Sequence, residues 1–533
     1  MTTPFFSLDA RPPGRLTRLA LLPGRHADTV PERWIISVAL CSTTLLLALM
    51  TSNVLAHWFI VPIFACGVLC CVDGILLFQA GGEHLFDPVA FTGAFGTFFF
   101  FLAPLLHVGR DYWFTSRMSI ATQALGDWRD WLGWMGILNL VSLFAYRVAH
   151  QWVWRRAARP RKRARYELDP FLLRHYGVVF LALTFALQVY LFARFGGVGA
   201  FVEAYGQTTT GQSSFEGLGW IMCIAESFPI VLIIVFVTFA RRYLKRATTS
   251  ELGAILTIVF ALLIVFGGLR GSRGNVVYGV AYAVGIVHLQ VRRFSWKFLV
   301  SSFGVLGLFM YFYAFYKVNP DTFRTVMESP DAASAIGERT GRTIETLVLG
   351  DLDRADIQAY MLFRLVRGGN AVEYALGRTY VDGILSFIPH SLSQYRPPGK
   401  LKYGTDLVFG ENAYNPGIFV STKIYGLAGE TMLNFGVWAV PLAFLAFGAA
   451  VGSLRVLWRD YDIGDPRRLL LPIAAILCVV ALSSDLDNVL YVFFRHALVP
   501  GALLWLASRK MRLAASRVVL NGSAARSSVW GRR

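Results

Sequence analysis

Charged residues are scarce in this chain. Asp, Glu, Lys and Arg make up 16% of its 533 residues, whereas 55% are hydrophobic. A soluble domain usually carries about 25% charged residues, so the composition excludes a water-soluble fold. Many apolar runs approach or exceed the roughly 20 residues that a helix needs to cross a bilayer. The alternating segments of a β-barrel are absent, and we predict an all-α polytopic membrane protein.

Several motifs and cysteine patterns are also missing. The chain has no Gly-x-Ser-x-Gly, His-Glu-x-x-His or Walker sequence, so hydrolase, zinc-protease and NTPase functions have no support. All six cysteines fall inside apolar runs, and we expect neither a disulfide framework nor a cysteine metal site. The first apolar run begins near Trp34, behind several arginines and without a small-residue cleavage site. We therefore expect no cleavable signal peptide.

The net charge of +18 lies mostly in short loops between apolar runs, as the positive-inside rule requires. Nucleic acid is therefore not an expected partner, although membrane lipids are. We predict about twelve spans, at 34–54, 58–80, 86–107, 131–149, 175–194, 217–240, 251–269, 274–291, 298–318, 427–453, 469–484 and 488–507. The basic loops all fall on one side, which we interpret as the cytoplasm, and both termini are predicted to lie there.

This interpretation divides the chain into five parts. Residues 1–33 form a cytoplasmic segment, 34–318 contain spans one to nine, 427–507 contain spans ten to twelve, and 508–533 form a basic cytoplasmic tail. Residues 319–426 form a long periplasmic loop, and loops of that length are commonly functional. Within it, Asp351-Leu352-Asp353 can cap an amphipathic helix over Arg354–Val366. The later part, Ile388–Asn415, is rich in Pro, Gly and Tyr and is expected to be irregular.

Two arginines stand between the seventh and eighth expected spans, in Arg270-Gly271-Ser272-Arg273-Gly274. An arginine at the centre of a bilayer helix costs roughly 3 kcal/mol, and such residues usually face a cavity or a ligand. The guanidinium fork matches phosphate oxygens, so Arg270 and Arg273 are predicted to clamp a pyrophosphate. The alternative is a short outer turn whose arginines reach water or lipid headgroups.

Glu430 and Asn434 are four residues apart at the expected entry to the tenth span, so they share one helix face. A lipid-facing glutamate is costly, and partial burial would raise the pKa of Glu430 towards neutrality, which suits a general base. The alternative is a helix-start residue favoured by the helix dipole.

Arg495 is expected within the membrane and needs a carboxylate partner. Asp487 or Glu430 is predicted to supply it, and the alternative is a purely structural ion pair. Asp351–Asp353 and Asp485–Asp487 match the Asp-x-Asp pattern of metal-binding nucleotide-sugar transferases. We reject a metal site there, because both lie on the expected outer side, where nucleotide sugars are not found.

The long loop carries further polar residues that could form a substrate cradle, although each alone is more simply a solvated loop residue. His390 is a second candidate base because histidine titrates near neutral pH, and Arg378, Lys400 and Lys423 are candidate substrate contacts. Asp73 and Glu226 lie inside expected spans two and six. Because no inverted repeat is visible, we interpret them as buried hydrogen-bonded residues and not as ion-coupling sites.

Three stretches together resemble the Wzy-type O-antigen and oligosaccharide repeat-unit polymerases. They are Gly271–Gly274, the long loop with Tyr374–Tyr380 and Phe387-Ile388-Pro389, and Gly429-Glu430 followed by Asn434-Phe435-Gly436. With the late spans they cover about half of the chain, and the first half is similar only in its hydropathy. The resemblance implies a glycosyltransferase C-type fold in the bacterial inner membrane. It also implies a periplasmic active site that works without metal, nucleotide or other cofactor.

The implied substrates are glycans linked to undecaprenyl pyrophosphate, as donor and as acceptor, with a chain-length regulator as a further partner. In this scheme Arg270 and Arg273 stabilise the leaving pyrophosphate, Glu430 or His390 is the base, and Arg495 helps with charge. Asn434, Arg378, Lys400, Lys423 and Asp487 are the other expected substrate contacts. The alternatives are a ligase that transfers finished glycan, and a flippase or other transporter.

Overall fold

The structure is a computed structural model. It describes residues 29–78, 85–113, 126–157, 164–208, 218–269, 271–294, 296–318, 325–326, 330–367, 373–388, 397–415, 423–462 and 464–511. The candidate site residues Arg270 and His390 lie outside these ranges.

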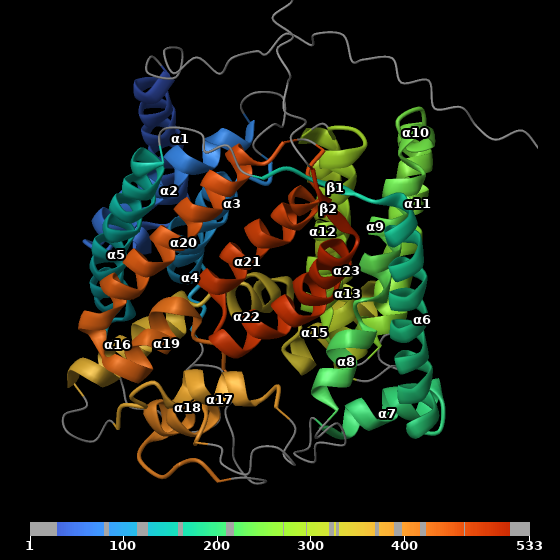
Figure 1. Cartoon of the computed structure of the whole chain (residues 1–533). Helices are drawn as coiled ribbons and strands as arrows, with labels where there is room; N and C mark the ends of the chain where they lie inside the picture. Colours follow the sequence, from blue (N-terminus) through green and yellow to red (C-terminus); the bar gives the residue numbers. More distant parts are fainter. Residues whose placement is uncertain are drawn as a thin grey trace, which may run out of the picture.

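The described chain is a bundle of helices (Figure 1), which confirms the predicted all-α membrane architecture. Ten of its helical segments are long and apolar enough to cross a membrane: Pro31–Thr51, Ile60–Phe78, Pro88–Gly109, Trp128–Arg156, Pro170–Arg194, Gly219–Phe239, Thr249–Gly268, Val437–Asp460, Pro466–Ser483 and Leu486–Leu506. Helix α12 (Arg273–Gln290) and helix α13 (Trp296–Val318) stand where the eighth and ninth spans were expected. They do not pass the same criterion, so the count of twelve stays a prediction.

Most of these ten segments contain more than one helical element. The first five segments consist of α1 (Thr29–Thr51); α2 (Ile60–Gly74) with η3 (Ile75–Phe78); α3 (Pro88–Thr97) with the π-helix η5 (Phe98–Leu102) and α4 (Ala103–Gly109); α5 (Trp128–Arg156); and α6 (Pro170–Arg194). The later ones comprise α8 (Gly219–Ala225) with α9 (Phe228–Phe239), α11 (Thr249–Leu263) with the π-helix η7 (Ile264–Gly268), η10 (Val437–Ala439) with α20 (Val440–Asp460), η11 (Pro466–Leu470) with α21 (Leu471–Ser483), and α22 (Leu486–Phe493) with the π-helix η12 (Phe494–Leu498) and α23 (Val499–Leu506).

Shorter elements connect the spans. They are η2 (Asn53–Leu55), α7 (Val198–Thr208), α10 (Arg241–Leu244), α15 (Pro330–Thr340), the π-helix η8 (Thr346–Asp351), α16 (Ala355–Arg367), α17 (Arg378–Leu385), α18 (Lys400–Phe409) and α19 (Gly426–Phe435). A two-stranded antiparallel ribbon pairs β1 (Tyr166–Leu168) with β2 (Ser508–Lys510), and Tyr166 lies opposite Lys510. The ribbon joins the segment before α6 to the end of the last span.

Helices α5 and α20 lie side by side because small residues let their backbones meet (Figure 1). A Cβ atom added to Gly448 would lie 2.3 Å from the carbonyl oxygen of Tyr146, and one added to Gly452 would lie 2.9 Å from the backbone of His150. Small residues four positions apart are a common basis for close helix packing in membranes.

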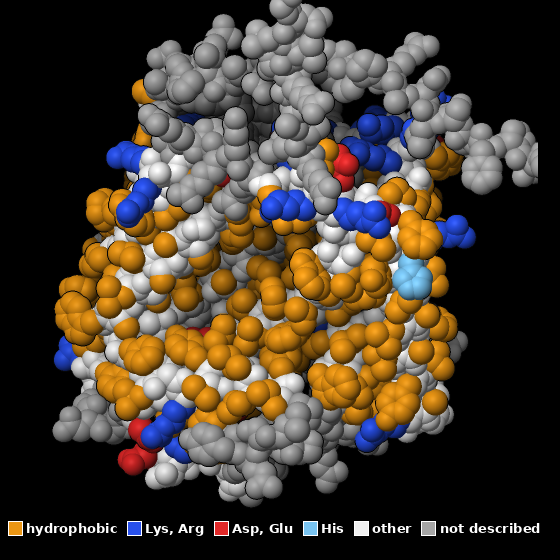
Figure 2. All heavy atoms as spheres, in the orientation of Figure 1, with side chains coloured by type: hydrophobic (Ala, Val, Ile, Leu, Met, Phe, Trp, Pro, Cys, Tyr) orange, Lys and Arg blue, Asp and Glu red, His pale blue; other side chains and the backbone are white. Residues whose placement is uncertain are grey.

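Helices α16, α17, α18 and α19 gather at one end of the bundle, which we name the loop end (Figure 1). Helix α10 and the start of α1 lie at the opposite end. Figure 2 shows hydrophobic side chains over the front of the body between two charged edges, with most of the visible Lys and Arg at the edge opposite the loop end. A belt of this kind is expected where a protein meets lipid.

The loop 319–426 is more ordered than its composition predicted. Helix α16 agrees with the expected run from Arg354 to Val366, and Asp353 caps it by accepting a hydrogen bond from the Ala355 N–H at 2.8 Å. The expectation of irregular structure over Ile388–Asn415 is wrong for Lys400–Phe409, which form α18. This helix buries Tyr403, Leu407 and Val408 in the same core as α16, so packing outweighs the local glycines and prolines.

The expected tenth span is also divided. The backbone of Gly436 has a φ of +82°, a left-handed conformation that ends α19 and lets the chain turn before Val437. Glu430 therefore lies in a short helix that is separate from the candidate span Val437–Asp460, and the expected continuous helix over 427–453 is divided.

Candidate functional site

Four ionisable side chains meet at the loop end, and we name them the carboxylate cluster: Lys400, Glu430, Asp485 and Asp487. They come from α18, α19, the residue directly before α22 and the first turn of α22. The Lys400 Nζ atom lies 2.8 Å from an Asp485 carboxylate oxygen and 2.9 Å from the Asp487 carboxylate. The cluster therefore joins segments that are far apart in the sequence.

Glu430 is 4% exposed, and both of its carboxylate oxygens accept hydrogen bonds. The Thr379 hydroxyl donates to Oε1 at 2.9 Å, and the Leu486 N–H donates to Oε2 at 2.7 Å. The Asn434 amide nitrogen donates to Thr379 Oγ1 at 2.7 Å and to the Glu430 carbonyl at 2.8 Å. Glu430 and Asn434 thus share one face, as predicted, and that face holds α17 and α22 against α19.

Asp485 fixes the start of α19. Its Oδ1 atom accepts hydrogen bonds from the N–H groups of Tyr425 at 2.8 Å and Gly426 at 3.0 Å, and its Oδ2 atom faces Lys400. The Asp485 side chain is fully buried, whereas those of Lys400 and Asp487 are 15% and 27% exposed. Lys400 and Asp487 therefore form the accessible edge of the cluster.

The charges of the cluster are unbalanced, because it holds three carboxylates and one ammonium group. Burial and the charge of Asp485 raise the pKa of Glu430 to about 8. Burial also raises the pKa of Asp485, against the opposing effect of Lys400. Although burial lowers it, the charges of Asp485 and Asp487 raise the pKa of Lys400 overall. Burial and like charge thus favour the protonated form of the buried carboxyls, whereas the two aspartates favour the charged form of Lys400.

Arg273, the first residue of α12, lies near a second cluster of buried polar side chains. An Arg273 guanidinium nitrogen lies 2.5 Å from Asp351 at the end of η8. Two residues later, the Asn275 amide donates to Glu226 at 2.6 Å, and the same carboxylate lies 3.0 Å from Arg495 Nε. Glu226 thus bridges Arg495 and Asn275, which lies two residues after Arg273 in α12.

This second cluster corrects the expected partner of Arg495, which is Glu226 and neither Asp487 nor Glu430. The physical reason is that those two carboxylates are engaged at the loop end by Lys400, Thr379 and the Leu486 backbone. Glu226 is 2% exposed and is a buried hydrogen-bonded residue, as predicted.

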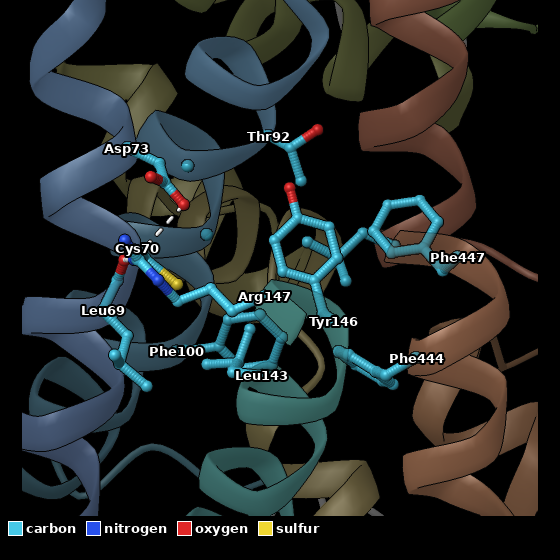
Figure 3. Close-up of a pocket in the computed structure, with 13 residues that line it drawn as sticks. Leu69, Cys70, Asp73, Thr92, Phe100, Leu143, Tyr146, Arg147, Phe444 and Phe447 are labelled. Atoms are coloured by element: carbon cyan, nitrogen blue, oxygen red, sulfur yellow. Dashed lines mark hydrogen bonds and ion pairs between the residues drawn. The ribbon is translucent and has the colours of Figure 1, made fainter. Parts of the chain in front are cut away.

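Asp73 is likewise buried and paired. It lies 3.3 Å from Arg147 in α5 and borders a small pocket between α2, α3, α5 and α20 (Figure 3). Aromatic side chains form much of the wall, among them Tyr146 and Phe444. This pocket contains none of the sequence-predicted site residues.

Two other predicted contacts lie at the loop end. The Arg378 guanidinium donates to the Tyr403 hydroxyl at 2.7 Å, and it lies 3.5 Å from Glu373. The Lys423 ammonium is close enough to lower the pKa of Asp356, although burial of that carboxyl raises it overall. Neither residue belongs to the carboxylate cluster.

Sequence reasoning missed a buried pair between His107 and Asp353. The His107 Nε2 atom lies 2.9 Å from Asp353 Oδ2, and Nδ1 lies 2.6 Å from the Tyr112 carbonyl oxygen. This contact ties the end of α4 to the residue that caps α16. No spacing links two residues so far apart in the sequence, although an isolated histidine in an apolar run was a visible signal.

No protein-family profile, no curated protein and no solved structure matches this chain. A functional assignment therefore depends on the chemistry of the two clusters.

Proposed function

We propose that the chain is a membrane glycosyltransferase that polymerises undecaprenyl-pyrophosphate-linked oligosaccharide repeat units, with its reaction centre at the loop end. The observation that carries the proposal is the carboxylate cluster, in which Lys400 and Asp487 border solvent above the buried Glu430 and Asp485. Buried groups of one charge sign with perturbed pKa values are concentrated at functional sites. In this proposal the loop end is periplasmic, as the charges of the loops predict.

The reaction requires a base and a cation. A hydroxyl of the acceptor attacks the anomeric carbon of the donor glycan, and the bond from that carbon to the pyrophosphate oxygen breaks. The electron pair leaves with undecaprenyl pyrophosphate, and the hydroxyl proton passes to a carboxylate. Because both Glu430 oxygens are engaged in a nearly closed site, we assign proton acceptance to the accessible Asp487. Glu430 then acts as a positioning residue that holds α17 and α22.

Fixed cations are the groups that best stabilise a departing pyrophosphate. Lys400 lies beside Asp487 at the accessible edge. Arg273 is paired with Asp351, but its Nη1 atom has no hydrogen-bond partner among the described residues. We assign Lys400 to the phosphate nearest the reacting carbon and Arg273 to the carrier lipid.

The test uses lipid-linked repeat units extracted from cells that lack this gene. Purified protein in nanodiscs should convert them to a ladder of longer glycans on a gel. Asp487→Asn and Arg273→Ala should lower the rate by roughly 10²- to 10³-fold, whereas the exposed-site controls Glu411→Gln and Arg367→Ala should retain it. Transfer of preformed chains without a ladder would indicate a ligase, and an unchanged ladder in Asp487→Asn would refute the assignment of the base.

A further inference from the structure

Helix α17 has two faces of different character. Thr379 and Gly383, four residues apart, are buried on one face. Thr379 bonds to Glu430, and a Cβ atom added to Gly383 would lie 3.4 Å from the Asp487 backbone. The opposite face carries Val381 and Ile384, which are 44% and 54% exposed. The helix therefore covers the carboxylate cluster with one side and presents apolar side chains on the other.

Leu376, which lies two residues before the start of α17, is also apolar and exposed. Leu376 is 70% exposed and has a φ of +48°, a conformation that is unfavourable for a bulky side chain. Two hydrogen bonds hold it there, from the Leu376 N–H to the Asn434 carbonyl at 3.0 Å and from the Gly377 N–H to Asn434 Oδ1 at 2.9 Å. A strained backbone that displays a leucine outwards indicates a use for that side chain.

The apolar face continues into the lipid-facing side of the bundle. A Cβ atom added to Gly377 would lie 3.6 Å from the Phe435 ring, and Phe435, Trp438 and Leu442 are 52%, 91% and 68% exposed. The last two begin the membrane-spanning segment Val437–Asp460. Figure 2 shows hydrophobic side chains on the front of the body down to the level of α17. Trp438 at the start of a span is typical of the membrane–water interface.

We propose that α17 and the preceding Leu376 form an interfacial membrane anchor, which inserts its apolar side chains into the lipid leaflet at the loop end. An amphipathic helix of this kind lies in the plane of the interface with its apolar side among the headgroups and the first acyl carbons. The anchor positions Asp487, which packs against Gly383, at headgroup depth. If the proposed function holds, this is the depth at which the pyrophosphate of a membrane-bound carrier lipid lies.

Spin labels measure the depth directly and need no enzymatic activity. Val381→Cys and Ile384→Cys would be labelled in nanodiscs of phosphatidylglycerol and phosphatidylethanolamine, with Trp438→Cys as the lipid-facing control and Glu373→Cys as the water-facing control. The side chain of Glu373 is 63% exposed. All six native cysteines are buried, so labelling of the unsubstituted protein gives the background.

An interfacial anchor requires that labels at 381 and 384 collide more with oxygen than with a water-soluble nickel chelate, as at position 438. A preference for nickel, as at position 373, would place the face in water and overturn the proposal. Low collision rates with both reagents would mean that protein covers the face, which also overturns it. If the labels are accessible to oxygen but the purified protein makes no glycan ladder, the proposed function is refuted and the anchor still stands.

Discussion

The pH dependence of stability tests the carboxylate cluster without knowledge of the substrate. Burial and the charge of Asp485 raise the pKa of Glu430 from 4.5 to about 8. Between these values the folded chain binds a proton that the unfolded chain releases, so the free energy of unfolding falls as pH rises. At about 1.4 kcal/mol per pKa unit, the loss is on the order of 5 kcal/mol across the window. Lys400 adds no slope there, because its raised pKa lies above an ordinary value of 10.5.

Glu430→Gln should remove this slope. The glutamine oxygen can accept from the Leu486 N–H, and its amide nitrogen can donate to Thr379, so the variant reproduces protonated Glu430. We expect wild type and variant to have similar unfolding midpoints near pH 5, and the variant to be the more stable protein near pH 9. Thermal unfolding in detergent at successive pH values measures the difference, with the exposed Glu411→Gln as control. A difference between wild type and variant that stays constant from pH 5 to 9 would refute the reasoning.

Three further substitutions test other contacts by the same unfolding assay. Lys400→Met leaves two carboxylates without their counter-charge and should cost about 3–5 kcal/mol. Lys402→Met removes the partly exposed contacts with Glu373 and Asp406 and should cost less than about 1 kcal/mol; equal losses would contradict this. Gly448→Ala should destabilise by about 1–3 kcal/mol, because the added carbon would press on the facing backbone of α5. Gly253→Ala, with open space around it, should not destabilise, and a loss there would show that helix contact is not the cause. Glu226→Gln leaves the buried Arg495 guanidinium without its counter-charge and should lower the free energy of unfolding by about 3–5 kcal/mol. A loss below about 1 kcal/mol would exclude a strong ion pair.

Hydropathy predicted most of the fold because an apolar run in lipid has few alternatives to a helix. It could not predict where helices break for local reasons. The left-handed backbone conformation of Gly436 separates Glu430 from the candidate span that follows it, and a hydropathy profile contains no information about a single backbone angle. It also gave no sign that Lys400–Phe409 would fold, because that helix depends on burial of Tyr403 and Leu407 against α16.

The sequence indicated which charged residues are important, but it did not indicate which residues they pair with. The sequence marked Glu226, Glu430, Asp487 and Arg495 as costly residues, but several pairings satisfy the same need for charge compensation. The choice between them is made by depth and helix rotation, which one sequence does not contain. Thr379 was not singled out within Tyr374–Tyr380, because a threonine in a polar loop is ordinary until Glu430 and Asn434 both bond to it.

The two clusters are held by one continuous helical segment. Helix α22 begins at Leu486, whose N–H bonds to Glu430, and it continues into the π-helix η12, which carries Arg495. Glu226 binds Arg495 and also Asn275 in the first turn of α12, beside Arg273. A π-helix rotates the residues that follow it relative to an α-helix, and such segments are frequent at functional sites. Glu226 therefore connects η12 to the start of α12, while Leu486 at the other end of the same helical segment connects it to the carboxylate cluster.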